Sequence, residues 1–155
     1  MAMRAWGNHL RVLILQFIKG IWKYGELESI KALASINNQI EIRQGGLGFS
    51  QRGNGAEEEH RCAAAELLQA AMDELRSDAW DMIILDEFNY AYYFGFISLD
   101  ELEQLLSVRP EKTHLIFTGR NAAQQLIDRA DLVTEMHLVK HPFQQGIKAQ
   151  KGIEF

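Results

Sequence analysis

The sequence predicts a single three-layer α/β domain, in which helices cover both faces of a parallel β-sheet. Apolar runs alternate with amphipathic helical patterns along the chain, which is typical of successive β-α-β units. Three of the apolar runs are nearly continuous in Val, Ile, Leu and Phe, as in strands buried on both faces. The 155 residues, 47% hydrophobic and 24% charged, suffice for one domain (1–155) with its own core.

The strands and helices are expected in alternating order. Five apolar segments are predicted to be strands: residues 10–18, 39–44, 80–86, 113–119 and 131–139. Four patterns between them are predicted to be helices: residues 25–35, 56–77, 98–107 and 121–130. Ser98 precedes Glu101 at the spacing of a capping box, and Asn121 is a suitable N-cap for the last helix.

The first residues, MAMRAWGNH, have the composition of a helix end, with Gly7 as its stop. In a doubly wound fold, a first strand and its loop come before such a helix. We therefore interpret the sequence as beginning midway through the first βα unit.

Two adjacent carboxylates, Asp86 and Glu87, follow the apolar run MIIL. An acid at the end of a buried strand is typical of a magnesium site in nucleotide-binding proteins, and the alternative is that one carboxylate caps the following helix. Such an acid normally faces a phosphate-binding loop of the form G-x-x-x-x-G-K-[ST]. The dipeptide Gly-Lys occurs nowhere in the sequence, and the Gly48–Gly53 spacing is interpreted as a flexible loop. The first strand and the phosphate loop are expected to be missing rather than degenerate.

Composition narrows the class of protein further. The net charge of −5 argues against general nucleic-acid binding, and no apolar run is long enough to span a membrane. Cys62 is the only cysteine, which excludes an intramolecular disulfide and favours the cytoplasm. It lies in a helical pattern and is predicted to be buried. The histidines show no zinc-binding spacing.

Several motifs occur in an order that is characteristic of one family. They are VLILQFIKG, a Gly-Phe loop, MIILDEFNYA, LIFTGRNA, ADLVTEM and the tail VKHPFQQGIKAQKGIEF. On these motifs the chain resembles the P-loop type of ATP:corrinoid adenosyltransferase, the cob(I)yrinic acid a,c-diamide or cob(I)alamin adenosyltransferase of vitamin B12 biosynthesis. The resemblance covers essentially the whole chain, and its most specific parts are TGRNA and the tail.

The resemblance implies a RecA-like P-loop fold, usually a cytoplasmic homodimer. It implies transfer of the 5′-deoxyadenosyl group of ATP to Co(I) of a reduced corrinoid, with release of triphosphate. The implied participants are ATP, Mg²⁺ or Mn²⁺, the corrinoid and an electron donor such as reduced flavodoxin or flavin. In the family a strand, the loop G-N-G-K-G-K-T-T and a helix precede RVLILQFIKG, and only the helix end is present here. We therefore expect this chain alone to bind ATP poorly.

Asp86 and Glu87 are the predicted metal contacts, directly or through water. Four residues are predicted to line the nucleotide site: Arg4, Gln16, Lys19 and Arg120. Lys19 and Arg120 follow strands at the carboxyl edge of the sheet, where ligands bind in such folds. For Lys19, a solvated surface position is the alternative. Arg4 lies on the remnant helix.

Three residues are predicted to contact the corrinoid: Phe49, Asn89 and Tyr90. The family's loop carries a Gly-Phe-Thr-Trp-like motif whose aromatic side chains displace the lower cobalt ligand. Here GFSQ keeps Phe49 but places Gln51 where the tryptophan is expected. The alternative for Phe49 is an anchor between loop and core. Other aromatics are expected to pack unless they compensate for Gln51: Trp22, Tyr92 and Tyr93.

Two classes of function remain beside the transferase. One is a non-catalytic corrinoid- or partner-binding protein derived from this fold. The other is a different P-loop enzyme, such as a nucleoside kinase, which the tail disfavours. Basic residues of the tail could meet corrinoid side chains or triphosphate, or form a structural seam: Lys140, His141, Lys148 and Lys151.

Overall fold

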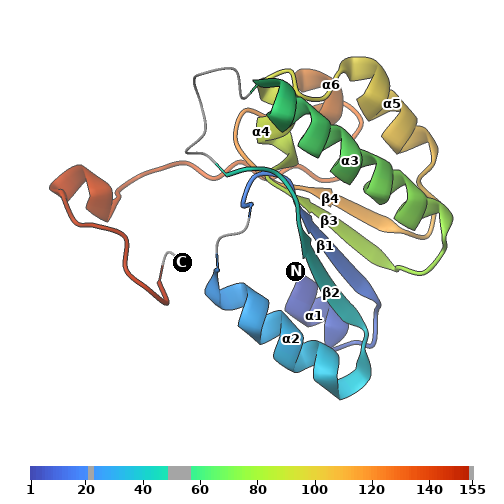
Figure 1. The fold of residues 1–155 in the computed structure, drawn as a ribbon, viewed down its shortest axis with the longest axis horizontal. Helices are drawn as coiled ribbons and strands as arrows, with labels where there is room; N and C mark the ends of the chain where they lie inside the picture. Colours follow the sequence, from blue (N-terminus) through green and yellow to red (C-terminus); the bar gives the residue numbers. More distant parts are fainter. Residues whose placement is uncertain (21–22, 49–56, 154–155) are drawn as a thin grey trace.

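A parallel sheet of four strands, in the order β2-β1-β3-β4, organises the chain (Figure 1). The computed structural model describes residues 1–20, 23–48 and 57–153. The strands are β1 (Val12–Gln16), β2 (Ile40–Gln44), β3 (Met82–Asp86) and β4 (His114–Phe117). All three strand pairs are parallel, so four of the five predicted strands and the α/β fold class are confirmed.

Alternate side chains of the strands enter two separate cores, one on each face of the sheet. Leu13 of β1 and Ile83 of β3 lie opposite each other, fully buried, in the larger core. Val12 and Met82, one residue earlier, lie in the smaller core on the other face. Because successive side chains of a strand point to opposite faces, only a strand buried on both sides can be apolar at every position.

Helices cover both faces. They are α1 (Ala2–Trp6), α2 (Gly25–Asn37), α3 (Glu57–Arg76), α4 (Phe88–Tyr93), α5 (Leu99–Ser107) and α6 (Gln124–Ile127), followed by the 3₁₀ turn η2 (Pro142–Gln145). In Figure 1, α1 and α2 lie on one side of the sheet, and α3 and α5 on the other. Residues of α1 and α2 accordingly belong to the smaller core, and those of α3 to α6 to the larger one.

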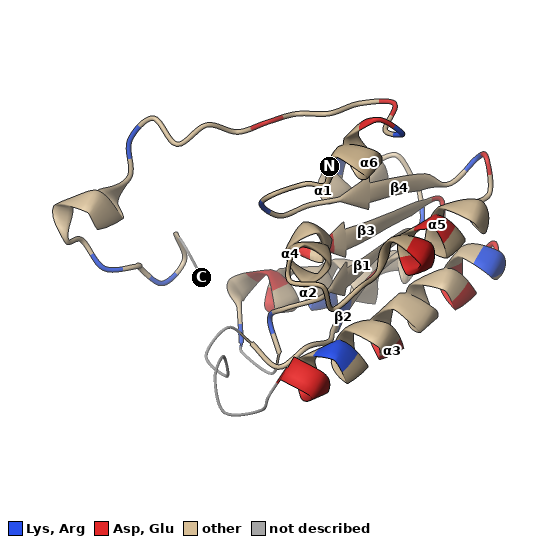
Figure 2. Cartoon of the chain, turned by 90° about the horizontal axis from the view of Figure 1, so that it is seen from above, with Lys and Arg blue, Asp and Glu red and all other residues tan. Residues whose placement is uncertain are grey.

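Charge follows this layering. Figure 2 shows the strands largely free of charged residues, with most acidic and basic residues on the helices and loops. The acidic first turn of α3, Glu57 to Glu59, lies at the positive end of the helix dipole, as its sequence indicates. Within the described part of the chain, no helix is both long and apolar enough to cross a membrane.

The capping box predicted at residue 98 is present. Ser98 is the N-cap of α5 and its hydroxyl accepts from the Glu101 backbone N–H, while the Glu101 carboxylate accepts from the Ser98 backbone N–H at 2.7 Å. The prediction that Cys62 is buried is wrong, because the side chain is exposed. The buried stripe of α3 passes through His60, Ala64 and Leu67, and Cys62 lies off that stripe.

The predicted fifth strand, residues 131–139, is not a strand. The segment is extended and exposed, and Met136 and Val139 are 91% and 94% accessible. Its apolar content suggested a strand, but a strand exists only where a neighbour accepts its backbone hydrogen bonds, and β4 pairs with β3 alone among the described residues.

Two predicted helix boundaries differ in detail. Asn121 is not an N-cap: it adopts a left-handed conformation (φ 57°), and α6 begins later, after Ala123. Asparagine tolerates this region, so the chain turns there before it can start the helix. α1 ends before Gly7 as predicted, but Gly7 is right-handed (φ −64°), and the left-handed residue is His9.

Candidate functional site at the carboxyl ends of β1, β3 and β4

Asp86 ends β3 at the carboxyl edge of the sheet and is held from both sides. Gln16, its partner in the β1–β3 register, donates from Nε2 to Asp86 Oδ2 at 3.1 Å. Thr118, directly after β4, donates from Oγ1 to Asp86 Oδ1 at 2.8 Å. The apolar run before Asp86 fixes the strand in the core, so the carboxylate emerges at the rim in a defined orientation.

Glu87 occupies a strained backbone position next to Asp86. It is the N-cap of α4 and is left-handed (φ 61°), which is uncommon outside glycine and concentrates at functional sites. Its side chain makes no capping hydrogen bond, so the alternative that Glu87 merely caps the helix is wrong. Burial and, next, the charge of Asp86 raise the pKa of Glu87, against the smaller opposing effects of Lys19 and Arg120.

Lys19 is paired within the site, so the alternative of a solvated surface position is wrong. Its side chain is 24% exposed, and Nζ donates to Glu26 Oε1 at 2.6 Å and lies 3.6 Å from Asp86 Oδ2. Burial acts to lower the pKa of Lys19, but the hydrogen bond to Glu26 and the charge of Asp86 outweigh it and raise the pKa. The ammonium also stands 4.7 Å from the ring centre of Tyr24.

Two buried side-chain oxygen atoms on β1 and α4 have no hydrogen-bond partner within the described residues. They are Oε1 of Gln16 and Oδ1 of Asn89, whose side chains belong to residues that are 2% and 6% exposed. A buried acceptor without a donor is costly, and in native sites a water or an ion commonly completes it. Mg²⁺ keeps most of its waters and takes one or two carboxylates from the protein. Asp86 and the unpartnered Gln16 oxygen, on two side chains that contact each other, are oxygen ligands of the kind that a hydrated magnesium ion takes.

Glycine allows the strand ends to approach closely. A Cβ atom on Gly119 (φ 123°) would lie 3.2 Å from Asn89 Cβ and 3.3 Å from Glu87 Oε2. The turn after β4 therefore packs directly against Glu87 and Asn89, the first and third residues after β3.

Of the other two residues predicted for the nucleotide site, one lies near Asp86 and Glu87 in the fold, and the described contacts do not bring the other there. Arg120 follows Gly119, is exposed, and its charge acts to lower the pKa of Glu87. Arg4 is exposed on α1, and its carbonyl oxygen accepts from Asn8, shortly before the amino end of β1. The described contacts do not join Arg4 to the Asp86 cluster.

The predicted corrinoid residues divide between two environments. Asn89 lies beside the turn after β4, where its backbone N–H donates to the Thr118 carbonyl oxygen at 3.2 Å. The Tyr90 ring packs against Phe94 with centroids 4.3 Å apart, and Phe94 contacts Tyr93, which is 58% exposed. Tyr92 packs against the larger core, as expected. Three residues considered for the corrinoid site lie outside the described residues: Trp22, Phe49 and Gln51.

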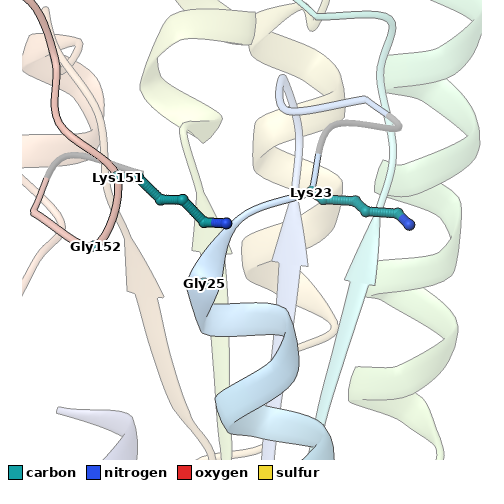
Figure 3. A pocket seen from close by; sticks show the side chains of 4 residues that line it. All are labelled: Lys23, Gly25, Lys151 and Gly152. Atoms are coloured by element: carbon teal, nitrogen blue, oxygen red, sulfur yellow. The ribbon is translucent and has the colours of Figure 1, made fainter.

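A pocket lies between the tail and the start of α2. It is lined by Lys23, Gly25, Lys151 and Gly152, and Figure 3 shows Lys151 extending toward the residues before α2. No group of three or more His, Cys, Asp or Glu side chains with metal-binding geometry exists in the portion of the chain that the structure describes.

Sequence reasoning missed Glu26 and Thr118. Thr118 follows a strand just as Asp86 does, so the shared carboxyl edge could have indicated it. Glu26 had no such indication, because its role comes from the path of the chain between β1 and α2.

Comparison with known proteins decides the family. A family model described as ATP:corrinoid adenosyltransferase BtuR/CobO/CobP matches residues 1–155. The chain belongs to this family. The resemblance stated from the motifs alone is thereby confirmed.

Individual members of the adenosyltransferase family match at similar levels. A corrinoid adenosyltransferase of Sinorhizobium sp is 38% identical over 143 residues, which cover 92% of this chain and 65% of that protein. The Escherichia coli (strain K12) corrinoid adenosyltransferase is 34% identical over 154 residues, 99% of this chain and 76% of the relative. That of Pseudomonas aeruginosa is 36% identical over 156 residues, with 74% of the relative covered. The chain thus spans about two thirds to three quarters of these relatives' length.

Proposed function

We propose that this chain forms the corrinoid-adenosylating part of an ATP:corrinoid adenosyltransferase in adenosylcobalamin biosynthesis. The reaction transfers the 5′-deoxyadenosyl group of ATP to Co(I) of a reduced corrinoid and releases triphosphate. The observation that carries the proposal is the carboxyl-edge cluster, in which Gln16, Lys19 and Thr118 converge on Asp86. Relatives named corrinoid adenosyltransferase match almost the entire chain, which supports the same reaction.

The proposed chemistry does not require an acid–base pair for proton transfer. Co(I) is a strong nucleophile, so the protein must align C5′ with cobalt and stabilise the departing triphosphate. Asp86 and Glu87 would hold Mg²⁺ or Mn²⁺, which when bound neutralises phosphate charge. Arg120, exposed at the same edge, would meet an anionic oxygen of the nucleotide.

The corrinoid is proposed to lie over the start of α4. Asn89 and Tyr90 follow the two acids within one turn, so a ligand at Asp86 and a ligand on α4 are neighbours. Tyr90, Tyr93 and Phe94 form an aromatic surface of the kind that packs against a flat macrocycle. Phe49 stays a prediction, as do the homodimer, the flavin or flavodoxin donor and the cytoplasmic location.

The test uses the gene product that carries residues 1–155, with any in-frame residues upstream of Met1 included. ATP, Mg²⁺, a chemical reductant and hydroxocobalamin are mixed, and the light-sensitive cobalt–carbon product is followed by absorbance. We expect product, and we expect Asp86→Asn to lower its rate at least tenfold. Corrinoid binding without product would favour the non-catalytic binding protein, and neither binding nor product would refute the proposal.

A further inference from the structure

The ammonium group of Lys19 lies between two carboxylates that belong to different parts of the fold. Glu26, in the first turn of α2, holds Nζ at 2.6 Å, and Asp86, at the end of β3, lies 3.6 Å from the same nitrogen. Gln16 Nε2 reaches both acids, with Asp86 Oδ2 at 3.1 Å and Glu26 Oε1 at 3.5 Å. The four side chains form one connected network.

A divalent cation at Asp86 would stand close to this ammonium. Two positive groups beside the same carboxylate oxygen repel each other, most strongly where water is largely excluded. The lysine therefore needs another anionic partner before the metal can use the whole charge of Asp86. Glu26 is already the nearer partner of Lys19, and it lies in the first turn of α2.

We propose that Glu26 is a positioning residue, which retains the Lys19 ammonium so that a divalent cation can replace it at Asp86. In this scheme Lys19 is the internal counter-ion of the metal-free site. The metal and the lysine compete for Asp86, and Glu26 sets the outcome. The proposal rests on the metal site of the proposed function.

Removing the charge of Glu26 leaves Lys19 with Asp86 as its principal carboxylate partner. Glu26→Gln should therefore weaken Mn²⁺ binding about tenfold. Lys19→Met removes the competitor and should strengthen Mn²⁺ binding a few fold. In the double variant, Glu26→Gln should no longer weaken Mn²⁺ binding, because no ammonium group is left to pair with Asp86.

The test measures free Mn²⁺ by electron paramagnetic resonance, with and without ATP, on the full chain. Glu28→Gln is the matched control: Glu28 lies two residues later in α2, and pairs at 3.1 Å with exposed Lys31. It removes the same charge without touching the network. Circular dichroism melts establish that each variant is folded.

The outcomes separate the two proposals. If Asp86→Asn leaves Mn²⁺ binding unchanged, or if the wild-type chain binds no Mn²⁺, the metal site itself is refuted. If Asp86→Asn weakens binding but Glu26→Gln acts no more strongly than Glu28→Gln, only the role of Glu26 fails. A Glu26→Gln effect of the same size in the Lys19→Met background would also overturn it, because the effect would then not pass through the lysine.

Discussion

The hydroxyl group of Thr118 donates a 2.8 Å hydrogen bond to Asp86 and accepts a 3.1 Å hydrogen bond from the backbone N–H of Glu87. The Thr118 side chain, directly after β4, thus orients Asp86 at the end of β3 and accepts the hydrogen bond of the strained residue Glu87. Neither strand alone could do both, so the geometry of the acid pair depends on β3 and β4 being neighbours.

Thr118→Val should destabilise the fold and weaken metal binding together. Valine keeps the shape but leaves a part-buried carboxylate oxygen and a backbone N–H without this partner, which costs about 1–3 kcal/mol in the free energy of unfolding. Urea denaturation and Mn²⁺ titration measure the two effects. Thr118→Ser, which keeps the hydroxyl, should stay close to wild type, and an equal loss in both variants would contradict the hydrogen-bond argument.

Asp81 should make the stability depend on pH in the acid range. Hydrogen bonds from the Arg11 side chain and then its backbone N–H lower the pKa of Asp81 to about 2. A carboxyl whose pKa is lowered by folding contributes stability above its unfolded pKa of about 4, and this is lost as the pH falls through the folded pKa. The loss should amount to about 1 kcal/mol at most, because the pair is partly exposed.

Chemical unfolding between pH 5 and pH 2, in wild type and Asp81→Asn, checks this prediction. The variant should be less stable at pH 5, and the difference should shrink toward pH 2. Parallel curves for the two proteins would show that Asp81 contributes no linkage. Asp100, an acid elsewhere on the surface, provides the control as Asp100→Asn.

Ser98→Ala should lower the free energy of unfolding by about 1 kcal/mol, the usual cost of an N-cap. The hydroxyl is one half of the capping box of α5, and its loss leaves the Glu101 N–H without that acceptor. Ser107→Ala at the far end of α5 is the matched control, since that hydroxyl only donates to the Gln104 carbonyl. Equal melting temperatures for the two alanine variants would count against the cap.

Gly46→Ala should be far more damaging than Gly95→Ala. Both glycines are left-handed (φ 81° and 69°), so both substitutions incur backbone strain. A Cβ on Gly46 would lie 2.1 Å from the Phe17 carbonyl oxygen, whereas one on Gly95 meets nothing within 4 Å. Expression yield and melting temperature should fall steeply only for Gly46→Ala, and comparable melting temperatures would refute the steric argument.

The strands with nearly continuous apolar sequences were predictable, because a strand that is buried on both faces needs apolar residues at successive positions. Asp86 was predictable for the same reason, since it ends such a run. Residues 131–139 contain apolar residues in a less continuous pattern and form no strand, because a strand also needs a neighbour to pair with, which composition does not reveal. The local sequence therefore indicates whether a segment can form a strand, but not which strand it would pair with.

Within the site, the sequence indicated residues at strand ends and missed those that arrive by other routes. Gln16 and Lys19 were expected at the site and both contact Asp86. Asn89 was also expected there, and it packs against Gly119, which also lies beside Glu87. Glu26 reaches the cluster only because the chain turns back after β1 to start α2 beside it. Cys62 shows the converse error: an apolar residue in a helical pattern is buried only if it lies on the stripe that faces the core.

The β1–β3 register is fixed by side-chain pairs at both ends, Arg11 with Asp81 and Gln16 with Asp86. The two pairs thus require the same number of residues between them in β1 and in β3. Inserting one residue within either strand would break one of the two pairs and turn the following apolar side chains toward the wrong face. Insertions in the segments that connect the strands leave both pairs intact. Those connections can therefore lengthen while Asp86 stays at the same distance from the core.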